Sequence, residues 1–149
     1  MAIDRSAGTV IIRSVNFMDL DGAQDLIIGE QHHIYTVLSI VVHCIALNTP
    51  ATDVFIVYFV GWDAHGGQSA QTTTVCKQNI AVNETFVWND KFSFNGCEPT
   101  GISGILNTTG EQDAIADQGS TTAQKLTFDV SHAADNYSVR VTYIDQNNS

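Results

Sequence analysis

The sequence predicts an all-β protein, an antiparallel β-sandwich or jelly-roll-like fold of seven to eight strands. It contains a succession of segments rich in β-branched and aromatic residues, and no segment of comparable strength has helical periodicity. Turn-forming Gly, Asn and Asp separate these segments. The clearest is 137–143, where apolar and polar side chains alternate almost without fault, as a half-buried strand requires.

The size of the chain indicates one domain spanning 1–149. A chain of 149 residues is long enough to bury about 68–70% of its unfolded surface without disulfides or metals. Its composition, 44% hydrophobic and 15% charged, is typical of a globular protein. No repeat and no linker divides it, so we expect a single β-sandwich domain.

The first half supplies the central strands. Residues 9–15 open as a β-branched strand, and residues 23–33 are ambiguous between a short strand and a helical turn. Residues 34–47 and 53–62 are the longest apolar segments, and the connection between them contains Pro50, which cannot donate to a ladder. These two segments are predicted to pair as a hairpin.

The second half continues the pattern after a Thr-rich strand at 72–76. Residues 80–94 are predicted as one strand, which ends at the turn dipeptide Asn95-Gly96. The segment 97–123 then breaks the pattern, since it is rich in Gly, Thr and Ser and contains no Lys or Arg. It is predicted to form a long loop, and residues 124–130 and 137–144 close the fold as two further strands.

The strand at 53–62 is apolar on both faces, so it is covered either by a second sheet and a loop or by a neighbouring subunit. Long loops in compact domains are usually functional surfaces or contact arms. These two features together give a predicted interface. Its hypothetical members are Val54, Phe55, Val57, Phe59, Ile102, Ile105 and Leu106.

The charge balance disfavours two classes of partner. The formal net charge is -10, and the six basic residues are scattered singly, so no basic stripe is available for direct nucleic-acid binding. The longest apolar run is shorter than the roughly 20 residues of a membrane helix. The three cysteines are an odd number and the first residues lack a secretory apolar region, which favours a reduced, cytosolic product.

No catalytic or cofactor motif stands out, and we expect no enzyme activity and no cofactor. The adjacent His32 and His33 would point to opposite faces of a strand, so they do not predict a metal site. Acidic residues in 19–30 match a calcium loop only in part, because Gln24 stands where the sharp turn requires Gly. We interpret them as turn acids and predict no metal ligand.

Four aromatic residues share one parity in the segment 80–94. They are Phe86, Trp88, Phe92 and Phe94. Such a row fills a sandwich core more often than it lines a sugar-binding groove. The groove nevertheless supports an alternative function, a carbohydrate- or receptor-binding β-sandwich module.

Three segments, 35–58, 80–92 and 136–144, resemble in order and pattern the small β-sandwich virion accessory proteins of tailed bacteriophages. The resemblance covers about two-thirds of the chain and consists of patterned strands. The chain departs from that pattern at 97–123, where such proteins have a short connection.

The resemblance implies a structural virion protein, a cement or decoration protein that stabilises a phage capsid through protein-protein contacts, or a neck or tail accessory component. The implied partners are the major capsid protein or another virion protein. The implied assembly is a homo-oligomer, trimer or dimer, located in the virion and assembled in the host cytoplasm.

Overall fold

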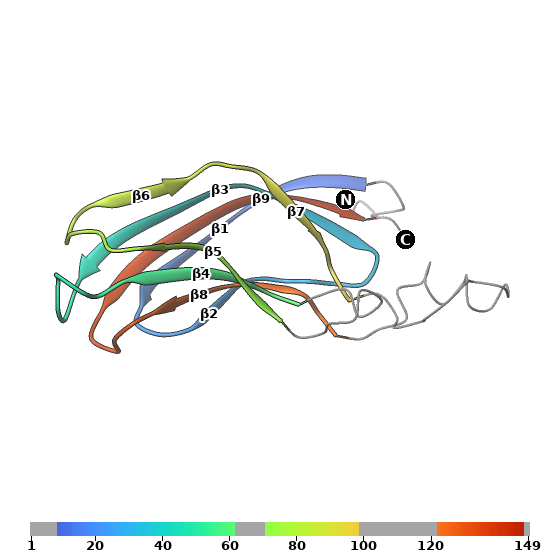
Figure 1. Ribbon diagram of the computed structural model, residues 1–149. Coiled ribbons are helices and arrows are strands. Elements are labelled where there is room, and N and C mark those ends of the chain that lie inside the picture. The colour runs from blue at the N-terminus through green and yellow to red at the C-terminus, as the bar shows by residue number, and fades with distance from the viewer. Residues whose placement is uncertain (1–8, 62–70, 99–121, 148–149) are drawn as a thin grey trace, which may run out of the picture.

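The computed structural model describes residues 9–61, 71–98 and 122–147, which form nine strands in two antiparallel sheets (Figure 1). The all-β prediction is confirmed. Sheet A has the order β1-β9-β3-β6, with β7 also pairing with β3, and sheet B has the order β2-β8-β4-β5. The strands of sheet A are β1 (Thr9–Leu20), β3 (His33–Ala46), β6 (Thr85–Trp88), β7 (Phe92–Asn95) and β9 (Asn136–Asn147). The strands of sheet B are β2 (Gln24–Ile28), β4 (Phe55–Val60), β5 (Thr72–Gln78) and β8 (Lys125–Val130).

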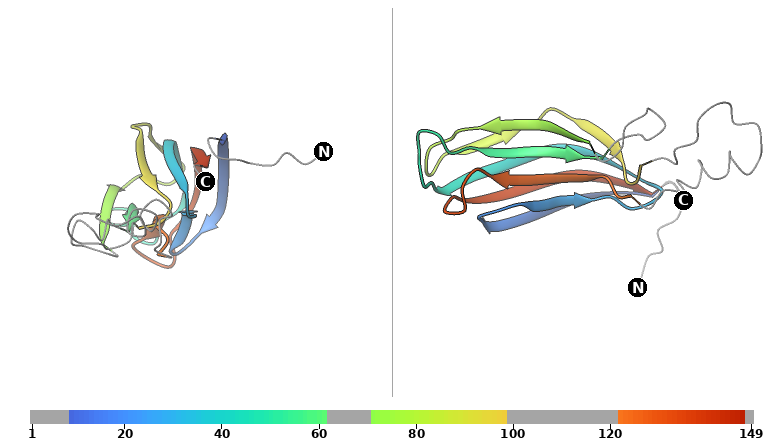
Figure 2. Two further views of the ribbon diagram at one scale, coloured as in Figure 1. Left: turned by 90° about the vertical axis from the view of Figure 1, so that its right-hand side faces the viewer. Right: turned by 60° about the horizontal axis from the view of Figure 1, so that its bottom comes forward.

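The connections give the strand order of a jelly roll. Apart from β4 and β5, and from β6 and β7, each strand is followed by one in the other sheet. With β6 and β7 counted as one interrupted strand, the sheets are ordered 1-8-3-6 and 2-7-4-5, as in the eight-stranded jelly roll. Figure 2 shows the two layers, with β1 and β2 on one side and β5, β6 and β7 on the other.

The predicted hairpin between 34–47 and 53–62 is wrong. The first segment forms β3 in sheet A and the second forms β4 in sheet B, so they face each other across the core. β3 pairs instead with β9, from His33 opposite Asn147 to Ala46 opposite Asn136. The sequence could not distinguish the two arrangements. Two apolar strands joined by a turn bury the same side chains, with the same alternation, whether they pair within one sheet or face each other from two sheets.

Two other elements differ from the sequence expectations. The predicted strand at 80–94 is two short strands, β6 and β7, which pair with successive parts of β3. In the break between them, the Trp88 indole donates to the Asp90 carbonyl at 2.9 Å. The ambiguous segment 23–33 contains strand β2, which pairs with β8.

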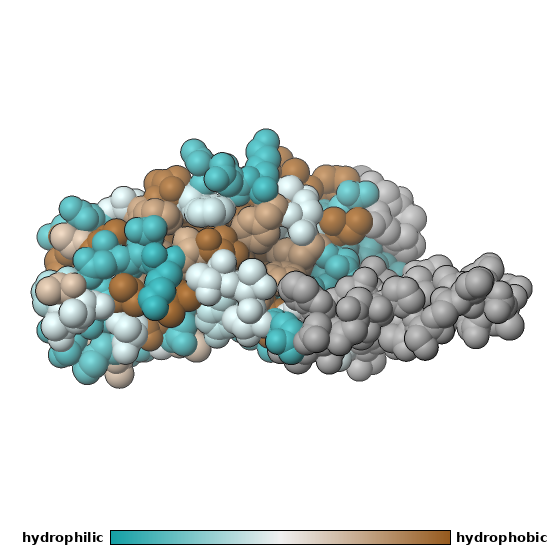
Figure 3. Space-filling model, in the orientation of Figure 1, coloured by the Kyte–Doolittle hydropathy of each residue, from teal (hydrophilic) through white to brown (hydrophobic). Residues whose placement is uncertain are grey.

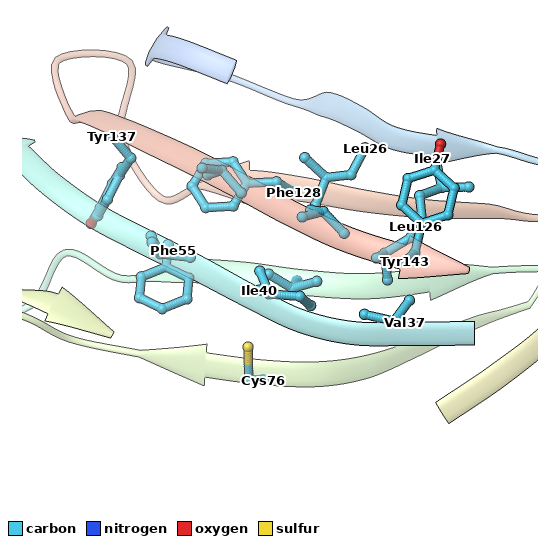
Figure 4. Close-up of a cluster of buried hydrophobic side chains, with 14 of the residues drawn as sticks. Leu26, Ile27, Val37, Ile40, Phe55, Cys76, Leu126, Phe128, Tyr137 and Tyr143 are labelled. Carbon is cyan, nitrogen blue, oxygen red and sulfur yellow. The ribbon is translucent and has the colours of Figure 1, made fainter. Parts of the chain in front are cut away.

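The core lies between the sheets and contains a cluster of aromatic rings among aliphatic side chains (Figure 4). Phe55 of β4 lies 5.9 Å from Phe128 of β8 and 5.7 Å from Tyr137 of β9, measured between ring centroids. All three are fully buried. This cluster joins the two sheets through interactions worth about 0.5–1.5 kcal/mol per aromatic pair beyond their area burial.

The two residues that flank the segment 99–121 are hydrogen-bonded to each other at one end of the sandwich. The Glu98 amide donates to the Thr122 carbonyl at 3.0 Å. Beside this pair the backbones of Gly29 and Gly96 approach so closely that a Cβ on Gly96 would lie 1.8 Å from the Glu30 oxygen. Only glycine fits there. Residues 99–121, most of the predicted long loop, lie outside the described residues.

Candidate functional site

Alternate residues of β1, β9, β3, β6 and β7 point away from the core and form the outer face of sheet A. Their inward neighbours are buried or half-buried, which fixes the parity of each strand. The registers then set these residues side by side in rows across the sheet. The outer face of sheet A consists of Val10, Ile12, Ser14, Asn16, Ile34, Thr36, Ser39, Val41, His43, Thr85, Val87, Ser93, Ser138, Arg140, Thr142, Ile144 and Gln146.

Short side chains bond across neighbouring strands on this face. The hydroxyls of Ser14 and Thr142 lie 3.1 Å apart, and those of Thr36 and Ser93 lie 2.8 Å apart. Because these side chains are small, the face is flat. Their hydroxyls also satisfy part of their hydrogen-bonding capacity by bonding to each other. A surface of this kind loses less hydration on contact than one that carries free polar side chains.

The outer face of sheet A carries no carboxylate among the described residues, although the chain has a formal net charge of -10. Its one permanent charge is the exposed Arg140. The two acids that belong to strands of this sheet are placed elsewhere: Asp145 is 3% exposed and points inward, and Asp19 is at the end of β1. The acids among the described residues therefore lie outside this face.

Large aliphatic side chains are exposed at both margins of the face. Ile12 and Val10 on β1 are 69% and 53% exposed, and Val87 on β6 is 54% exposed. Single exposed apolar residues are ordinary on a protein surface. Aliphatic residues spread over a broad sheet face without carboxylates are instead typical of a contact surface.

The outer face of sheet B has a different character. Asp25 and Lys125 form an ion pair at 3.5 Å there, with both side chains partly exposed. Ile56 on β4 is flanked by Asp129 on β8 and by Lys77 on β5. A mixture of both signs of charge is typical of a solvated face.

A third feature lies inside sheet A, where ionisable side chains link three strands. The Asp145 carboxylate on β9 lies 3.2 Å from the Arg13 guanidinium on β1 and 2.6 Å from Nδ1 of His33 on β3. Nε2 of His33 is 3.4 Å from the Glu30 carboxylate. Carboxylates therefore flank both ring nitrogens, an arrangement that ties strands together rather than one that activates a hydroxyl or thiol nucleophile.

An acidic pair occupies the opposite end of the sandwich. The carboxyls of Asp53 and Asp135 are hydrogen-bonded to each other, and Asp135 also accepts the Asn48 amide at 2.9 Å. Burial and the neighbouring carboxyl raise the pKa of Asp135, while the backbone hydrogen bond from Thr49 lowers the pKa of Asp53. Of the two carboxyls, Asp135 therefore takes up a proton at the higher pH, because two adjacent buried carboxylates repel each other.

The aromatic residues of the segment 80–94 divide between the core and a groove. Trp88, Phe92 and Phe94, together with Phe59 of β4, line a cavity of about 400 Å³ that opens on the side of the molecule where β5 and β6 lie. In Figure 3 brown and tan apolar atoms gather in the middle of this side. Phe86 instead packs against Phe55 in the core, with ring centroids 5.5 Å apart.

The structure separates the residues of the predicted interface. Phe55 and Val57 have no exposed surface and fill the space between the sheets, while Val54 and Phe59 are partly exposed. Ile102, Ile105 and Leu106 lie outside the described residues. Sequence reasoning missed the outer face of sheet A, although the alternation of exposed aliphatic residues in β1 was a signal for it.

Two further sequence interpretations concern metals and membranes. Asp25, one of the turn acids, lies on β2 and accepts the Thr127 hydroxyl at 2.9 Å. Within the described ranges no group of three or more His, Cys, Asp or Glu side chains is arranged to hold a metal ion. Those ranges also contain no helix with the length and hydropathy of a membrane span.

No protein-family model and no curated protein matches the chain. Among solved structures it is similar to a Bacillus endospore appendage protein from a family of disulfide-linked pili, with a TM-score of 0.42 and 12% identity over 100% of this chain and 97% of that one. It is also similar to a chain of the T13 IBDV viral particle, with a TM-score of 0.42 and 11% identity over 99% of this chain and 37% of that one.

A third similar structure is a chain of the empty top component of cowpea mosaic virus, with a TM-score of 0.38 and 13% identity over 96% of this chain and 84% of that one. This chain thus spans little more than a third of the IBDV chain it matches. All three TM-scores lie below 0.5.

Proposed function

We propose that this protein is a structural subunit that joins a larger protein assembly through the outer face of sheet A. The observation that carries the proposal is the absence of carboxylates from that face, among the described residues, on a chain with a net charge of -10. Desolvating a carboxylate is expensive, so a face that is buried by a partner is best built without one. Exposed Ile12 and Val87 supply apolar area at its two margins.

The assembly we propose is a virus particle, in which the chain acts as a capsid cement or decoration protein, or as a neck or tail accessory component. The resemblance of its strand segments to virion accessory proteins supports this choice. The proposed partners are the major capsid protein or another virion protein, with the chain itself as a dimer or trimer. The proposed role needs no cofactor and no catalytic residue.

A charge placed on the outer face of sheet A tests this function. Val87→Glu is expected to lower incorporation of the chain into particles at least tenfold, because a carboxylate buried without a partner costs upward of about 1.4 kcal/mol. Val87 is 54% exposed, so the substitution leaves folding intact. The measurement is the amount of tagged chain that co-sediments with virus particles purified from the virus that encodes this protein.

The matched control is Thr72→Glu, which adds the same charge at an exposed position of β5, opposite Val60 on the outer face of sheet B. The control is expected to be incorporated like the unmodified chain. Equal incorporation of both variants, or a loss confined to Thr72→Glu, would contradict the assignment of the contact surface to sheet A.

A second candidate function, binding of a glycan or receptor group, is favoured by the aromatic groove. Trp88 and three phenylalanines line the groove together with Thr73, Thr74 and Ser93, and a sugar can stack on aromatic rings of this kind. If this is the function, glycans will change tryptophan fluorescence and Trp88→Ala will abolish their binding. Binding that survives Trp88→Ala would exclude the groove as the site.

A further inference from the structure

Among the described strands, β1 forms an open edge of sheet A. It pairs with β9 on one side, and no described strand pairs with its other side (Figure 2). It has 12 residues, about twice the usual strand length. Native proteins block such edges with proline, lysine or inward-pointing charges. Between Val10 and Met18 there is no proline, lysine or acid, and Arg13 is already engaged with Asp145.

We propose that β1 pairs antiparallel with β1 of a second copy of this chain, about a two-fold axis that passes beside Ser14. Sheet A then continues across the dimer, and the two outer faces join into one surface. The inference rests on the proposed function, because it supplies the pairing that doubles the contact surface. An antiparallel edge related by a two-fold axis is self-complementary, since each strand offers the other the same row of donors and acceptors.

The side chains select the register. With Ser14 opposite its own copy, Val10 lies opposite Met18, two residues that are 53% and 60% exposed in the single chain. This apolar pair occurs twice, once at each end of the contact. A register centred on Arg13 would set two guanidinium groups directly opposite each other, which is destabilising. A register centred on Val15 would carry the pairing through the whole irregularity between Phe17 and Leu20, whereas the register centred on Ser14 reaches it only at Met18.

Charge favours a second copy as the occupant of this edge. Two chains of net charge -10 repel each other, so they associate where neither presents a carboxylate. β1 meets that condition from Val10 to Met18, and so do the outward residues of its neighbour β9, such as Thr142 and Ile144. A strongly basic partner would be drawn to the acids elsewhere on the chain rather than to this edge.

Disulfide trapping in the full chain tests the register. Directly opposed residues have Cα atoms about 4.5–5.5 Å apart, which a disulfide spans, so Ser14→Cys is expected to form a covalent dimer on mild oxidation. The control is Asn16→Cys, also exposed on β1, whose two copies would lie about 13 Å apart. The native thiols Cys44, Cys76 and Cys97 are buried, and burial raises the pKa of the Cys76 thiol to about 11, so they do not compete.

The proposal predicts a dimer band for Ser14→Cys that is at least tenfold stronger than that for Asn16→Cys. Absence of the Ser14→Cys dimer, or equal cross-linking of both variants, overturns it. The incorporation test with Val87→Glu is read separately. If Val87→Glu loses incorporation but Ser14→Cys forms no dimer, the β1 pairing is overturned and the proposed function is not. If Ser14→Cys forms a selective dimer but Val87→Glu is incorporated normally, the proposed function is overturned and the pairing is not.

Discussion

Asp135→Asn is expected to stabilise the protein at neutral pH, by about 1 kcal/mol in the free energy of unfolding. Asp135 is fully buried and its carboxyl is hydrogen-bonded to that of Asp53. An asparagine keeps the acceptor for the Asn48 amide and offers an N–H to Asp53, so the repulsion between two buried carboxyls is removed. Asp135→Ala, by contrast, is expected to cost about 2–3 kcal/mol, since it leaves that amide without its partner.

The sign of the pH dependence separates the two acids. The pKa of Asp135 is raised in the folded protein, so its contribution to stability is complete below the unfolded pKa of about 4 and is lost as pH rises through the folded value. The pKa of Asp53 is lowered, so its contribution is present above about 4 and is lost as pH falls through its folded value. The advantage of Asp135→Asn should therefore shrink as pH falls from 7 toward 4.

Urea unfolding at several pH values measures the difference in stability between Asp135→Asn and the unmodified chain. The control is Asp129→Asn, which removes a partly exposed carboxylate on sheet B and is expected to change stability by less than about 0.5 kcal/mol. An Asp135→Asn protein that is less stable than the unmodified chain at pH 7, with no change in its pH profile, would show that repulsion from the Asp53 carboxyl does not raise the pKa of Asp135.

Asp145→Ala is expected to destabilise the protein by about 3 kcal/mol, or to lower Tm by about 6–12 °C. Asp145 is 3% exposed and is the common partner of Arg13 and His33, so its removal leaves two groups of neighbouring strands without their carboxylate. The loss falls on the end of sheet A where β1 and β3 flank β9. Thermal unfolding followed by circular dichroism is the measurement.

Asp25→Ala is the comparison for that experiment. Its ion pair with Lys125 is partly exposed, so a loss of about 1 kcal/mol is expected, including the hydrogen bond from Thr127. Equal losses for Asp25→Ala and Asp145→Ala would mean that the interior network adds nothing beyond a surface pair.

The sequence predicted the strands well where one face is buried and the other is polar. Residues 137–143 alternate cleanly and fall inside β9, because the inward Tyr and Val residues are separated by outward Ser, Arg and Thr. The layer of a strand was harder to predict. Alternation in β3 and β4 shows that both contribute to the core, but it does not show whether they share a sheet, and the predicted hairpin failed for that reason.

The candidate contact surface, the outer face of sheet A, could not be predicted from the sequence pattern either. The predicted interface took apolar residues of β4 as its guide, and the structure shows that Phe55 and Val57 face the core. The outer face of sheet A is built mainly from Ser, Thr, Val and Ile on strands that are distant in the chain, such as Ser14 beside Thr142. Its lack of carboxylates appears only once the registers place those residues on one side of one sheet.

The most direct test of the central claim is an electron-microscopy reconstruction of the assembly that contains this chain. The claim predicts that the outer face of sheet A is buried against a neighbouring subunit, while the charged outer face of sheet B, with Asp25 and Lys125, faces solvent. A reconstruction in which sheet B makes the contact and the outer face of sheet A is exposed would contradict it.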